Sequence, residues 1–251
     1  MEINKIILGD CINVLKTLPN KFSDLIITDP PYNISQKNLK ISRKHIAGGA
    51  KDLNYDFGEW DSFETRESFL EFTQKWVSET SRILKENGTF YSFFSKQEVN
   101  YFENILRKNG FYVRAICVWH KTNPTPLLFK VGYASASEFF VFATKSKGAK
   151  HTFNYKLGQQ HNVFTYPICM GKERVKDEEG KTLHPTQKPI KLIEKLILYS
   201  SNEGDLVVDP FCGVGTTCVA AKKNKRNFIG IEIEEKFINA ANKRLKEIKE
   251  A

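Results

Sequence analysis

Residues 205–217 read Asp-Leu-Val-Val-Asp-Pro-Phe-Cys-Gly-Val-Gly-Thr-Thr, and this stretch decides the fold. The apolar run before Asp209 predicts a buried strand, and the glycines behind it predict a tight turn into a helix from about Thr217. The next predicted strand, residues 228–233, carries Glu232, which lies 232 − 209 = 23 residues after Asp209. An acid at this distance from a glycine-rich turn is spaced to hold ribose hydroxyls. The turn has neither a complete GxGxxG nor a Walker lysine, so it predicts an adenosine ligand without requiring a pyrophosphate.

A second stretch, Asp29-Pro30-Pro31-Tyr32, follows the apolar run of residues 25–28. Two successive prolines cannot continue a central strand, because neither offers a backbone N–H to the ladder. The chain therefore leaves the sheet at the carboxyl end of a strand, which is where open α/β sheets place their ligands. A carboxylate, two stiffened carbonyls and an aromatic face could hold a planar base by its exocyclic amine. The alternative is a purely structural Asp-Pro-Pro turn.

Outward from these stretches, predicted strands alternate with predicted helices. This order indicates a doubly wound α/β sheet and excludes a sandwich. A helix over residues 64–85 is expected to end at Asn87-Gly88, because this pair is a common C-terminal signal. The predicted strands are residues 3–8, 25–28, 89–94, 111–119, 138–143, 205–209 and 228–233, and the other predicted helices are residues 11–17, 97–108, 190–199, 217–223 and 235–248.

Two further sites lie at predicted helix starts. Asp10 follows the first strand, where it either caps the next helix or accepts a hydrogen bond from a ligand amine. The stretch His184-Pro185-Thr186-Gln187-Lys188-Pro189 opens the helix from Ile190. A helix start preceded by a lysine attracts anions, including a carboxylate, although an ordinary N-terminal turn would have the same sequence.

Composition sets the class of protein. The chain has 251 residues, with 38 Lys and Arg against 29 Asp and Glu, a formal net charge of +9 and a pI near 9.2. This length predicts one α/β domain over residues 1–251, and the basic surplus favours a polyanionic partner. There is no signal pattern and no membrane-spanning apolar run, so we expect a cytoplasmic protein. The five cysteines show no CxxC spacing, which favours free thiols over disulfides or a metal site.

Basic residues gather in two segments of poor periodicity. The first is a loop over residues 33–60, and the second is an insert over about residues 144–183, where aromatic residues are interleaved. Both could be solvated surface excursions, but such residues also supply phosphate and base contacts. The predicted nucleic-acid contacts are Lys37, Lys40, Arg43, Lys44, Lys121, Lys145, Lys147, Lys172 and Arg174.

Together, three motifs resemble those of S-adenosylmethionine-dependent DNA amino-methyltransferases. Residues 209–217 resemble the cofactor loop, with Cys212 and Val214 in its variable places, and residues 184–189 resemble the motif that precedes the loop. Asp29-Pro30-Pro31-Tyr32 resembles the catalytic motif. The order catalytic motif, recognition insert, cofactor loop is that of the circularly permuted beta group. The resemblance spans almost the whole chain and is weakest over the two basic segments.

The resemblance implies a Rossmann-like class I methyltransferase fold with a seven-stranded mixed sheet. It also implies that Glu232 holds the ribose, that Asp10 holds the adenine amine, and that Lys188 with its neighbours holds the methionine end of the cofactor. The implied cofactor-binding residues are Asp10, Asp29, Thr186, Gln187, Lys188, Asp209, Phe211, Gly213, Gly215, Thr216, Thr217 and Glu232.

The chemistry of the catalytic motif follows from its acceptor. An exocyclic amine conjugated to its ring is a poor nucleophile. The Asp29 carboxylate and the Pro30 carbonyl can accept hydrogen bonds from its two N–H groups. This exposes the nitrogen lone pair for direct in-line transfer of the methyl group, without a covalent intermediate. The base must first leave the duplex, and Tyr32 offers a stacking face.

The acceptor is expected to be adenine N6, because the resembling family usually pairs Asp at the first motif position with adenine. The alternative is cytosine N4. Methylation of RNA or of a protein amide, and a binding module without activity, are further readings. No Pro-Cys dipeptide occurs, which argues against cytosine-C5 chemistry. The expected partner is double-stranded DNA, in a restriction-modification or orphan modification system; a homodimer and a cognate restriction endonuclease stay open.

Overall fold

The computed structural model describes residues 2–33, 40–41, 53–54, 63–126 and 132–248. The chain divides into two compact units: Met1–Pro30 with Lys75–Ala251, and the smaller Pro31–Gln74. The assignment of residues 1–251 to a single domain stays a prediction. Much of the basic loop over residues 33–60 lies outside the described residues.

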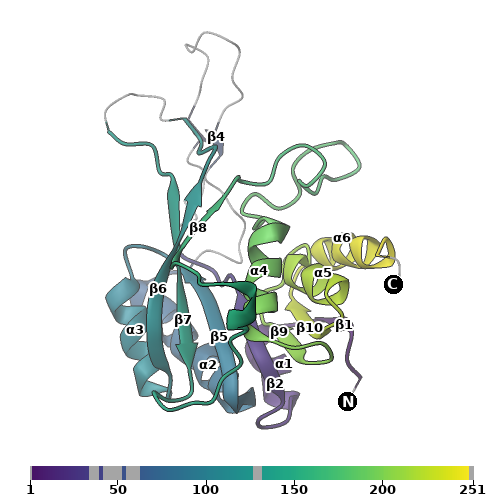
Figure 1. Ribbon diagram of the computed structural model, residues 1–251. Coiled ribbons are helices and arrows are strands. Elements are labelled where there is room, and N and C mark those ends of the chain that lie inside the picture. The colour runs from purple at the N-terminus through teal and green to yellow at the C-terminus, as the bar shows by residue number, and fades with distance from the viewer. Residues whose placement is uncertain (1, 34–39, 42–52, 55–62, 127–131, 249–251) are drawn as a thin grey trace. The chain divides into compact units, whose positions relative to one another are not determined.

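The larger unit is built on an eight-stranded sheet with the order β1-β10-β9-β2-β5-β7-β6-β8 (Figure 1). Neighbouring strands are parallel, except that β7 is antiparallel to both β5 and β6. The predicted mixed α/β sheet is therefore confirmed. Its strands are β1 (Lys5–Leu8), β2 (Ser23–Thr28), β5 (Leu84–Phe94), β6 (Tyr112–Lys121), β7 (Ser137–Thr144), β8 (Val163–Tyr166), β9 (Leu206–Asp209) and β10 (Asn227–Glu232).

All seven predicted strands are present, and β8 is an eighth that the sequence did not reveal. It lies inside the insert that was expected to be irregular, and it pairs in parallel with the end of β6. The indole of Trp119 also donates to the Tyr166 carbonyl at 2.9 Å. β8 has only four residues and lies at the edge of the sheet. It is recognised by its backbone pairing with β6, because its sequence contains no apolar run.

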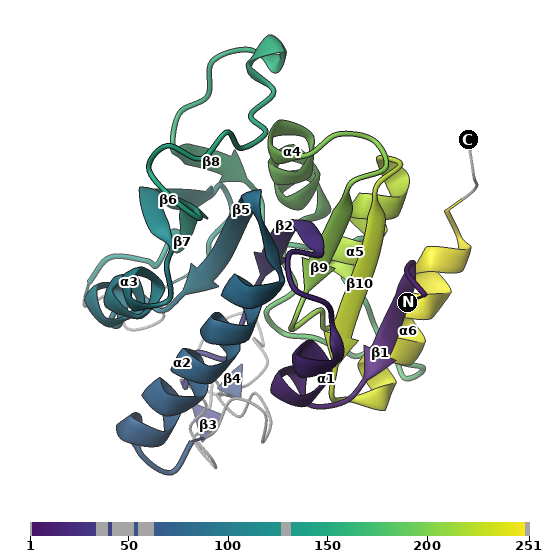
Figure 2. The same cartoon turned by 90° about the horizontal axis from the view of Figure 1, so that it is seen from below.

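Helices cover both faces of this sheet. Helix α5 packs against both α4 and α6, and α3 packs on β6. Figure 2 shows α3 and α4 on opposite sides of the sheet. In the smaller unit, β3 (Lys40–Ile41) pairs antiparallel with β4 (Leu53–Asn54). The helices are α1 (Cys11–Thr17), α2 (Arg66–Ile83), α3 (Val99–Lys108), α4 (Ile190–Ser200), α5 (Thr216–Lys223) and α6 (Glu235–Lys246), and a 3-10 turn, η2, spans Tyr155–Leu157.

The predicted end of the second helix is wrong. Helix α2 ends at Ile83, and β5 begins at Leu84 without an intervening turn. The pairing of β2 with β5 shifts between Ser23 and Leu25, so Asn87-Gly88 falls in a bulge of β5 and not at a helix end. Ile83 and Leu84 are both fully buried, and this burial carries the chain straight from the helix into the sheet.

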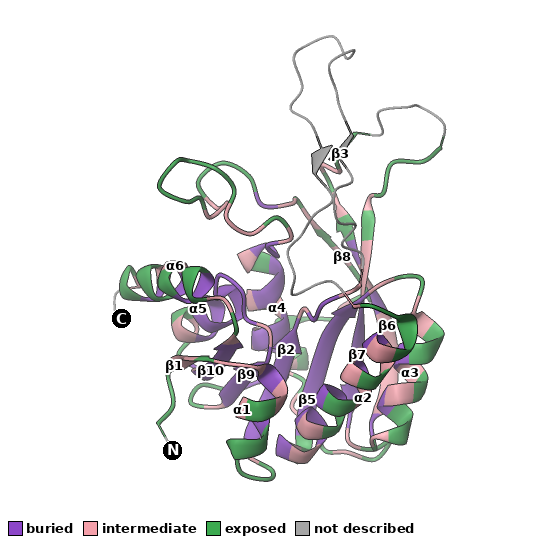
Figure 3. Cartoon of the chain, turned by 180° about the vertical axis from the view of Figure 1, so that it is seen from behind, coloured by how far each residue is buried: buried purple, intermediate pink, exposed green. Residues whose placement is uncertain are grey.

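The central strands form the core. β2 and β9 are buried along almost their whole length, and their central residues (Leu25–Ile27 and Leu206–Val208) are apolar, as expected for parallel strands covered on both faces. Figure 3 shows the buried residues concentrated along the middle of the sheet. All five cysteines are buried free thiols, as predicted. None of the helices formed by the described residues is long and apolar enough to cross a membrane.

The topology brings several strand ends to one edge of the sheet. β2 pairs with β9 although about 180 residues separate them, so the chain leaves both strands at the same edge. β7 runs the opposite way and begins at this edge, where Phe139 pairs with Phe94 at the end of β5. Side chains that follow β2, end β9 and open β7 can therefore meet.

Candidate active site

The two strongest motifs meet where β2 and β9 end. Asp209, the last residue of β9, accepts a hydrogen bond from the Thr28 hydroxyl at 2.9 Å and another from the Phe211 amide at 3.1 Å. Burial raises the pKa of Asp209 to about 7, against the hydrogen bonds that lower it. Because its side chain is buried, Asp209 holds the end of β2 and the start of the glycine-rich turn together.

The turn over residues 212–215 depends on its glycines. Gly213 and Gly215 have φ of +50° and +74°, a region that side chains disfavour. A Cβ on Gly213 would lie 2.9 Å from Nε2 of His184, and one on Gly215 would lie 2.6 Å from the Cβ of Ala241. The backbone is therefore packed closely on both sides, and Gly215 leads directly into α5, whose first residues are Thr216 and Thr217.

Glu232 ends β10 and binds this turn. One carboxylate oxygen accepts from the Gly213 amide at 2.8 Å, and the other accepts from the amides of Ile233 and Glu234, both at 2.9 Å. Burial raises its pKa, although these hydrogen bonds oppose the shift. Next to Glu232 are two exposed apolar residues that sequence reasoning missed: Leu8, its pairing partner on β1, and Ile233, which follows it in the chain, each 56% exposed.

Asp10 has the capping role that was one of its two predicted roles. Its side chain accepts from the Asn13 amide at 2.9 Å at the start of α1. The other role, as an acceptor for a ligand amine, stays a prediction. Asp10 follows β1 and thus lies at the same edge of the sheet as Glu232.

The segment before α4 is fixed by Gln187, a predicted cofactor-binding residue, and by Glu173, which sequence reasoning did not single out. The Gln187 amide exchanges hydrogen bonds with the backbone of Val175 and Glu173 at 2.9 and 2.8 Å. The Glu173 carboxylate in turn accepts from the Ile190 amide at 2.8 Å, at the first residue of α4. Burial and neighbouring cations lower the pKa of His184 to about 3, so this imidazole is neutral where it packs edge-on against Phe237.

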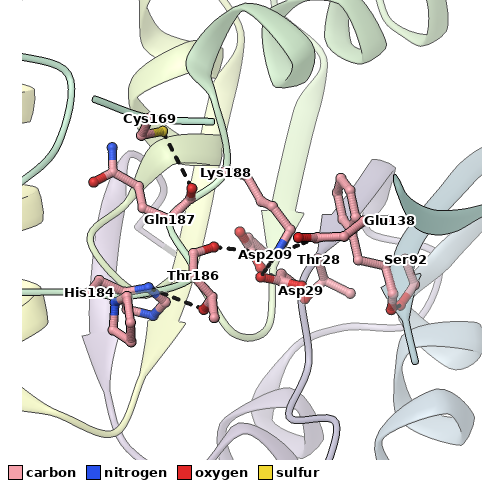
Figure 4. A network of polar contacts seen from close by, with 12 residues as sticks. Thr28, Asp29, Ser92, Glu138, Cys169, His184, Thr186, Gln187, Lys188 and Asp209 are labelled. Carbon is pink, nitrogen blue, oxygen red and sulfur yellow. Dashed lines mark hydrogen bonds and ion pairs between the residues drawn. The ribbon is translucent and has the colours of Figure 1, made fainter. Parts of the chain in front are cut away.

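Lys188 connects this segment to the catalytic motif (Figure 4). Its ammonium bonds the Asp29 carboxylate and the Thr186 carbonyl, and it lies 3.3 Å from the carboxylate of Glu138. Burial alone would lower the pKa of Lys188, but the two carboxylates outweigh burial and raise it. Lys188 is therefore a charged, buried ammonium held between two acids.

Glu138, near the start of β7, is the residue of this network that sequence reasoning missed. Its carboxylate also pairs with Lys121 at 2.7 Å. Burial would raise the pKa of Glu138, yet the charges of Lys188 and Lys121 lower it overall, so this carboxylate is ionised. Glu138 belongs to no motif that could be recognised in the sequence. Its position at the edge of the sheet near Asp29 follows only from its pairing with Trp119 on β6.

The catalytic tetrapeptide spans the boundary between the two units. Asp29 and Pro30 end the first segment of the larger unit, whereas Pro31 and Tyr32 begin the smaller one. In the larger unit the structure thus brings together Asp29, the glycine-rich turn and the segment around Lys188.

The predicted DNA contacts are placed very differently from one another. Lys121 pairs with Glu138, and Lys172 is exposed. Arg174 donates to the carbonyls of Cys169, His184 and Pro185, so it cross-links the segment before α4. Lys40 lies in β3, where its side chain is not described, and Lys37, Arg43 and Lys44 lie outside the described residues.

Lys145 and Lys147 follow the end of β7, at the edge of the sheet opposite Asp29. Thr144, the last residue of β7, pairs with Thr89, well before the end of β5. Lys145 donates to the carbonyl and hydroxyl of Ser81 at 2.9 and 2.7 Å, and Lys147 is exposed. These two residues therefore lie away from the catalytic edge.

Comparison with known proteins gives one consistent result. Residues 23–243 match a family model described as DNA methylase, for N6 and N4 methyltransferases. The type II methyltransferase M.HinfI of Haemophilus influenzae is 42% identical over 98% of this chain and 69% of its own length. The type II methyltransferase M2.DpnII of Streptococcus pneumoniae is 35% identical over 96% of this chain and 90% of its own length.

Solved structures agree in fold. A crystal structure of an M1.HpyAVI–SAM complex has a TM-score of 0.71 and 31% identity, covering 96% of this chain and 98% of that one. The PvuII cytosine-N4-specific DNA methyltransferase has a TM-score of 0.75 at 19% identity, over 97% of this chain and 87% of that one, and shows the fold alone. The family predicted from the three motifs is confirmed: the chain belongs to the N6/N4 family of DNA methylases.

Proposed function

We propose that this chain transfers a methyl group from S-adenosylmethionine to N6 of adenine in double-stranded DNA. One observation carries the proposal: Asp29 directly follows β2, and the Thr28–Asp209 hydrogen bond joins the end of that strand to the end of β9, where the glycine-rich turn begins. Family membership limits the acceptor to an exocyclic amine, N6 or N4. Asp as the first residue of the motif favours adenine, and cytosine N4 is the second candidate.

The residues around the turn fit an adenosine-containing cofactor. Leu8 pairs with Glu232, and Ile233 directly follows it; both expose apolar side chains, which suits a planar base next to a ribose. The close backbone packing at Gly213 leaves no room for a side chain beside the turn. Asp10 is proposed to accept from the adenine amine, and the Lys188 ammonium to bind the methionine carboxylate. The other residues proposed to shape or line this site are Thr186, Gln187, Asp209, Phe211, Gly215, Thr216 and Thr217.

The chain's own contribution to chemistry is orientation and charge. When bound, the sulfonium cofactor supplies an electrophilic methyl group. The Asp29 carboxylate and the Pro30 carbonyl accept hydrogen bonds from the two N–H groups of the target amine, and this holds the nitrogen lone pair toward that methyl group. As positive charge develops on the nitrogen, the Asp29 carboxylate stabilises it. Pro31 stiffens the turn, and Tyr32 is proposed to stack on the extruded base.

DNA contacts are proposed for the catalytic side of the molecule. Lys172, exposed in the insert, and Lys121, at the end of β6, come from elements of that side, and the loop with Lys37, Lys40, Arg43 and Lys44 is proposed to join them. The position of Lys145 and Lys147 at the opposite edge does not support a contact with the same duplex.

The biological setting is proposed from the relatives. M.HinfI and M2.DpnII are named as type II methyltransferases, which supports a role in a bacterial restriction-modification system. Action on cellular DNA would place the chain in the cytoplasm. A homodimer and a cognate restriction endonuclease stay predictions from the resemblance.

Replacing Asp29 tests the chemistry. Asp29→Ala should abolish methyl transfer, and Asp29→Asn should keep only part of it, because Asn retains an acceptor oxygen without the charge. Cofactor binding should largely persist, because Asp29 is proposed to bind the target amine and to stabilise the charge that develops there. The measurement is single-turnover methyl transfer at saturating DNA and cofactor. Asp24→Asn is the matched control at the other end of β2, where its carboxylate pairs with Lys85. A near-normal rate for Asp29→Ala would reduce the motif to a structural turn.

Trimming Ile233 tests the cofactor assignment. Ile233→Ala should leave the folding free energy nearly unchanged, because the side chain is 56% exposed. It should weaken cofactor binding by about 1–2 kcal/mol, or about 5- to 30-fold in Kd, if the side chain covers the cofactor base. Calorimetry measures this, with Val163→Ala on β8 as the equally exposed control. Equal cofactor affinities for both variants would exclude Ile233 from the site.

Salt dependence tests the DNA-facing side. Lys172→Ala should lower the slope of log K against log salt by about 1, since each neutralised phosphate releases counterions. Lys147→Ala should leave the slope unchanged, because Lys147 lies at the other edge of the sheet. Both slopes are measured by titrating labelled duplex DNA at several salt concentrations. The reverse result would place the DNA on the opposite edge.

A further inference from the structure

Alternating charges cross the active site in the order Lys121, Glu138, Lys188, Asp29 (Figure 4 shows the last three). The side chain of Lys188 is 5% exposed, and its ammonium also faces the ring of Phe93 at 5.0 Å. A cation this deeply buried has little water to bind, so the carboxylates within reach decide its position. Besides the methionine carboxylate that Lys188 is proposed to bind, two carboxylates of the chain are within reach of its ammonium, one at Asp29 and one at Glu138 on β7.

The two oxygens of Glu138 are used unequally. One oxygen pairs with Lys121 at 2.7 Å. The other is buried and accepts no hydrogen bond from any described residue, although Nζ of Lys188 lies only 3.3 Å away. A buried carboxylate oxygen without a hydrogen bond is costly. It therefore marks a position that the Lys188 ammonium can occupy after a short shift from Asp29.

Such a shift would matter for Asp29. An ammonium bonded to a carboxylate occupies a lone pair and offsets its negative charge. A carboxylate needs both the lone pair and the negative charge if it is to accept a hydrogen bond from an amine and stabilise a developing cation. While Lys188 bonds Asp29, the carboxylate is therefore a weaker acceptor for the target amine.

We propose that Glu138 is a positioning residue that takes over the Lys188 ammonium during methyl transfer and so leaves the Asp29 carboxylate to the target amine. This inference rests on the proposed role of Asp29 as the acceptor for that amine. Glu138 itself touches neither the amine nor the methyl group. Lys121 fixes Glu138 from its other side, which keeps the carboxylate ionised and aimed at Lys188.

A purely structural role for Glu138 makes a different prediction. If Glu138 only tied β7 to β6 through Lys121, its loss would have the same effect whether or not Lys188 were present. In the positioning role, its loss matters only while an ammonium is available to compete for Asp29. A double-mutant cycle between Glu138 and Lys188 separates the two.

The test is single-turnover methyl transfer by the full chain at saturating DNA and cofactor, for the wild type, Glu138→Gln, Lys188→Met and the double variant. Gln keeps the size of Glu138 and an acceptor for Lys121 but removes the charge. Glu138→Gln should slow transfer about tenfold or more. In the Lys188→Met background the same substitution should change the rate by less than about twofold.

The matched control is Glu194→Gln, in which a partly buried glutamate of α4 loses its pairing with Lys223 at 2.7 Å. It should transfer methyl groups at the wild-type rate. An unchanged rate for Glu138→Gln would overturn the inference, and so would an equal slowing in both backgrounds. If Glu138→Gln is unfolded at the assay temperature, Glu138→Asp takes its place in the cycle: its shorter side chain holds the carboxylate farther from Lys188, so it too should slow transfer only while Lys188 is present. A wild-type protein that binds DNA and cofactor but transfers nothing would refute the proposed function, and the inference with it.

Discussion

The parallel pairing of β2 with β9 is the constraint on which the site depends. It joins strands from opposite ends of the sequence, and the Thr28–Asp209 hydrogen bond closes their shared edge. Because both strands are buried and carry apolar residues at their centres, this register is strongly specified. The residue that follows β2 and the turn that follows β9 are therefore held side by side by the core itself. A one-residue slip of either strand would turn its buried side chains to the other face and separate the two motifs.

At this edge of the sheet, charged side chains are paired with one another although they are largely buried. Lys188 and Glu138 hold each other in their charged states, and Lys121 and Asp29 extend the balance in both directions. Each carboxylate alone would be disfavoured by burial, and each ammonium likewise. The network therefore holds charged groups in fixed positions at this edge of the sheet. The left-handed glycines play the corresponding role for the backbone, because they let the turn pack directly against His184 and Ala241.

Much of the fold was predictable from the sequence, for physical reasons. The runs before Asp29 and Asp209 are apolar because their strands are buried, and glycine and proline mark where the chain leaves them. β8 was not predictable, because an edge strand of four residues is defined by its partner β6. The end of α2 was mispredicted because Asn87-Gly88 forms a bulge when Ile83 and Leu84 are drawn into the core.

The same distinction applies to the site. Motif residues such as Gly213 and Lys188 could be found from spacing and residue type. Glu138, Leu8 and Ile233 could not, because their importance comes from strand register and exposure. Basic residues were the least predictable: charge and proximity in sequence grouped Lys145 with Lys172, yet β7 carries Lys145 to the opposite edge. A charged residue in a loop indicates a function only once its position on the sheet is known.

The central claim is that Asp29 and its neighbours methylate adenine at N6. The most direct measurement is mass spectrometry of nucleosides from unmethylated duplex DNA incubated with the protein and isotopically labelled S-adenosylmethionine. We expect the label to appear in N6-methyladenine. Label in N4-methylcytosine would move the acceptor to the other base of the family, and label in neither nucleoside would contradict the account.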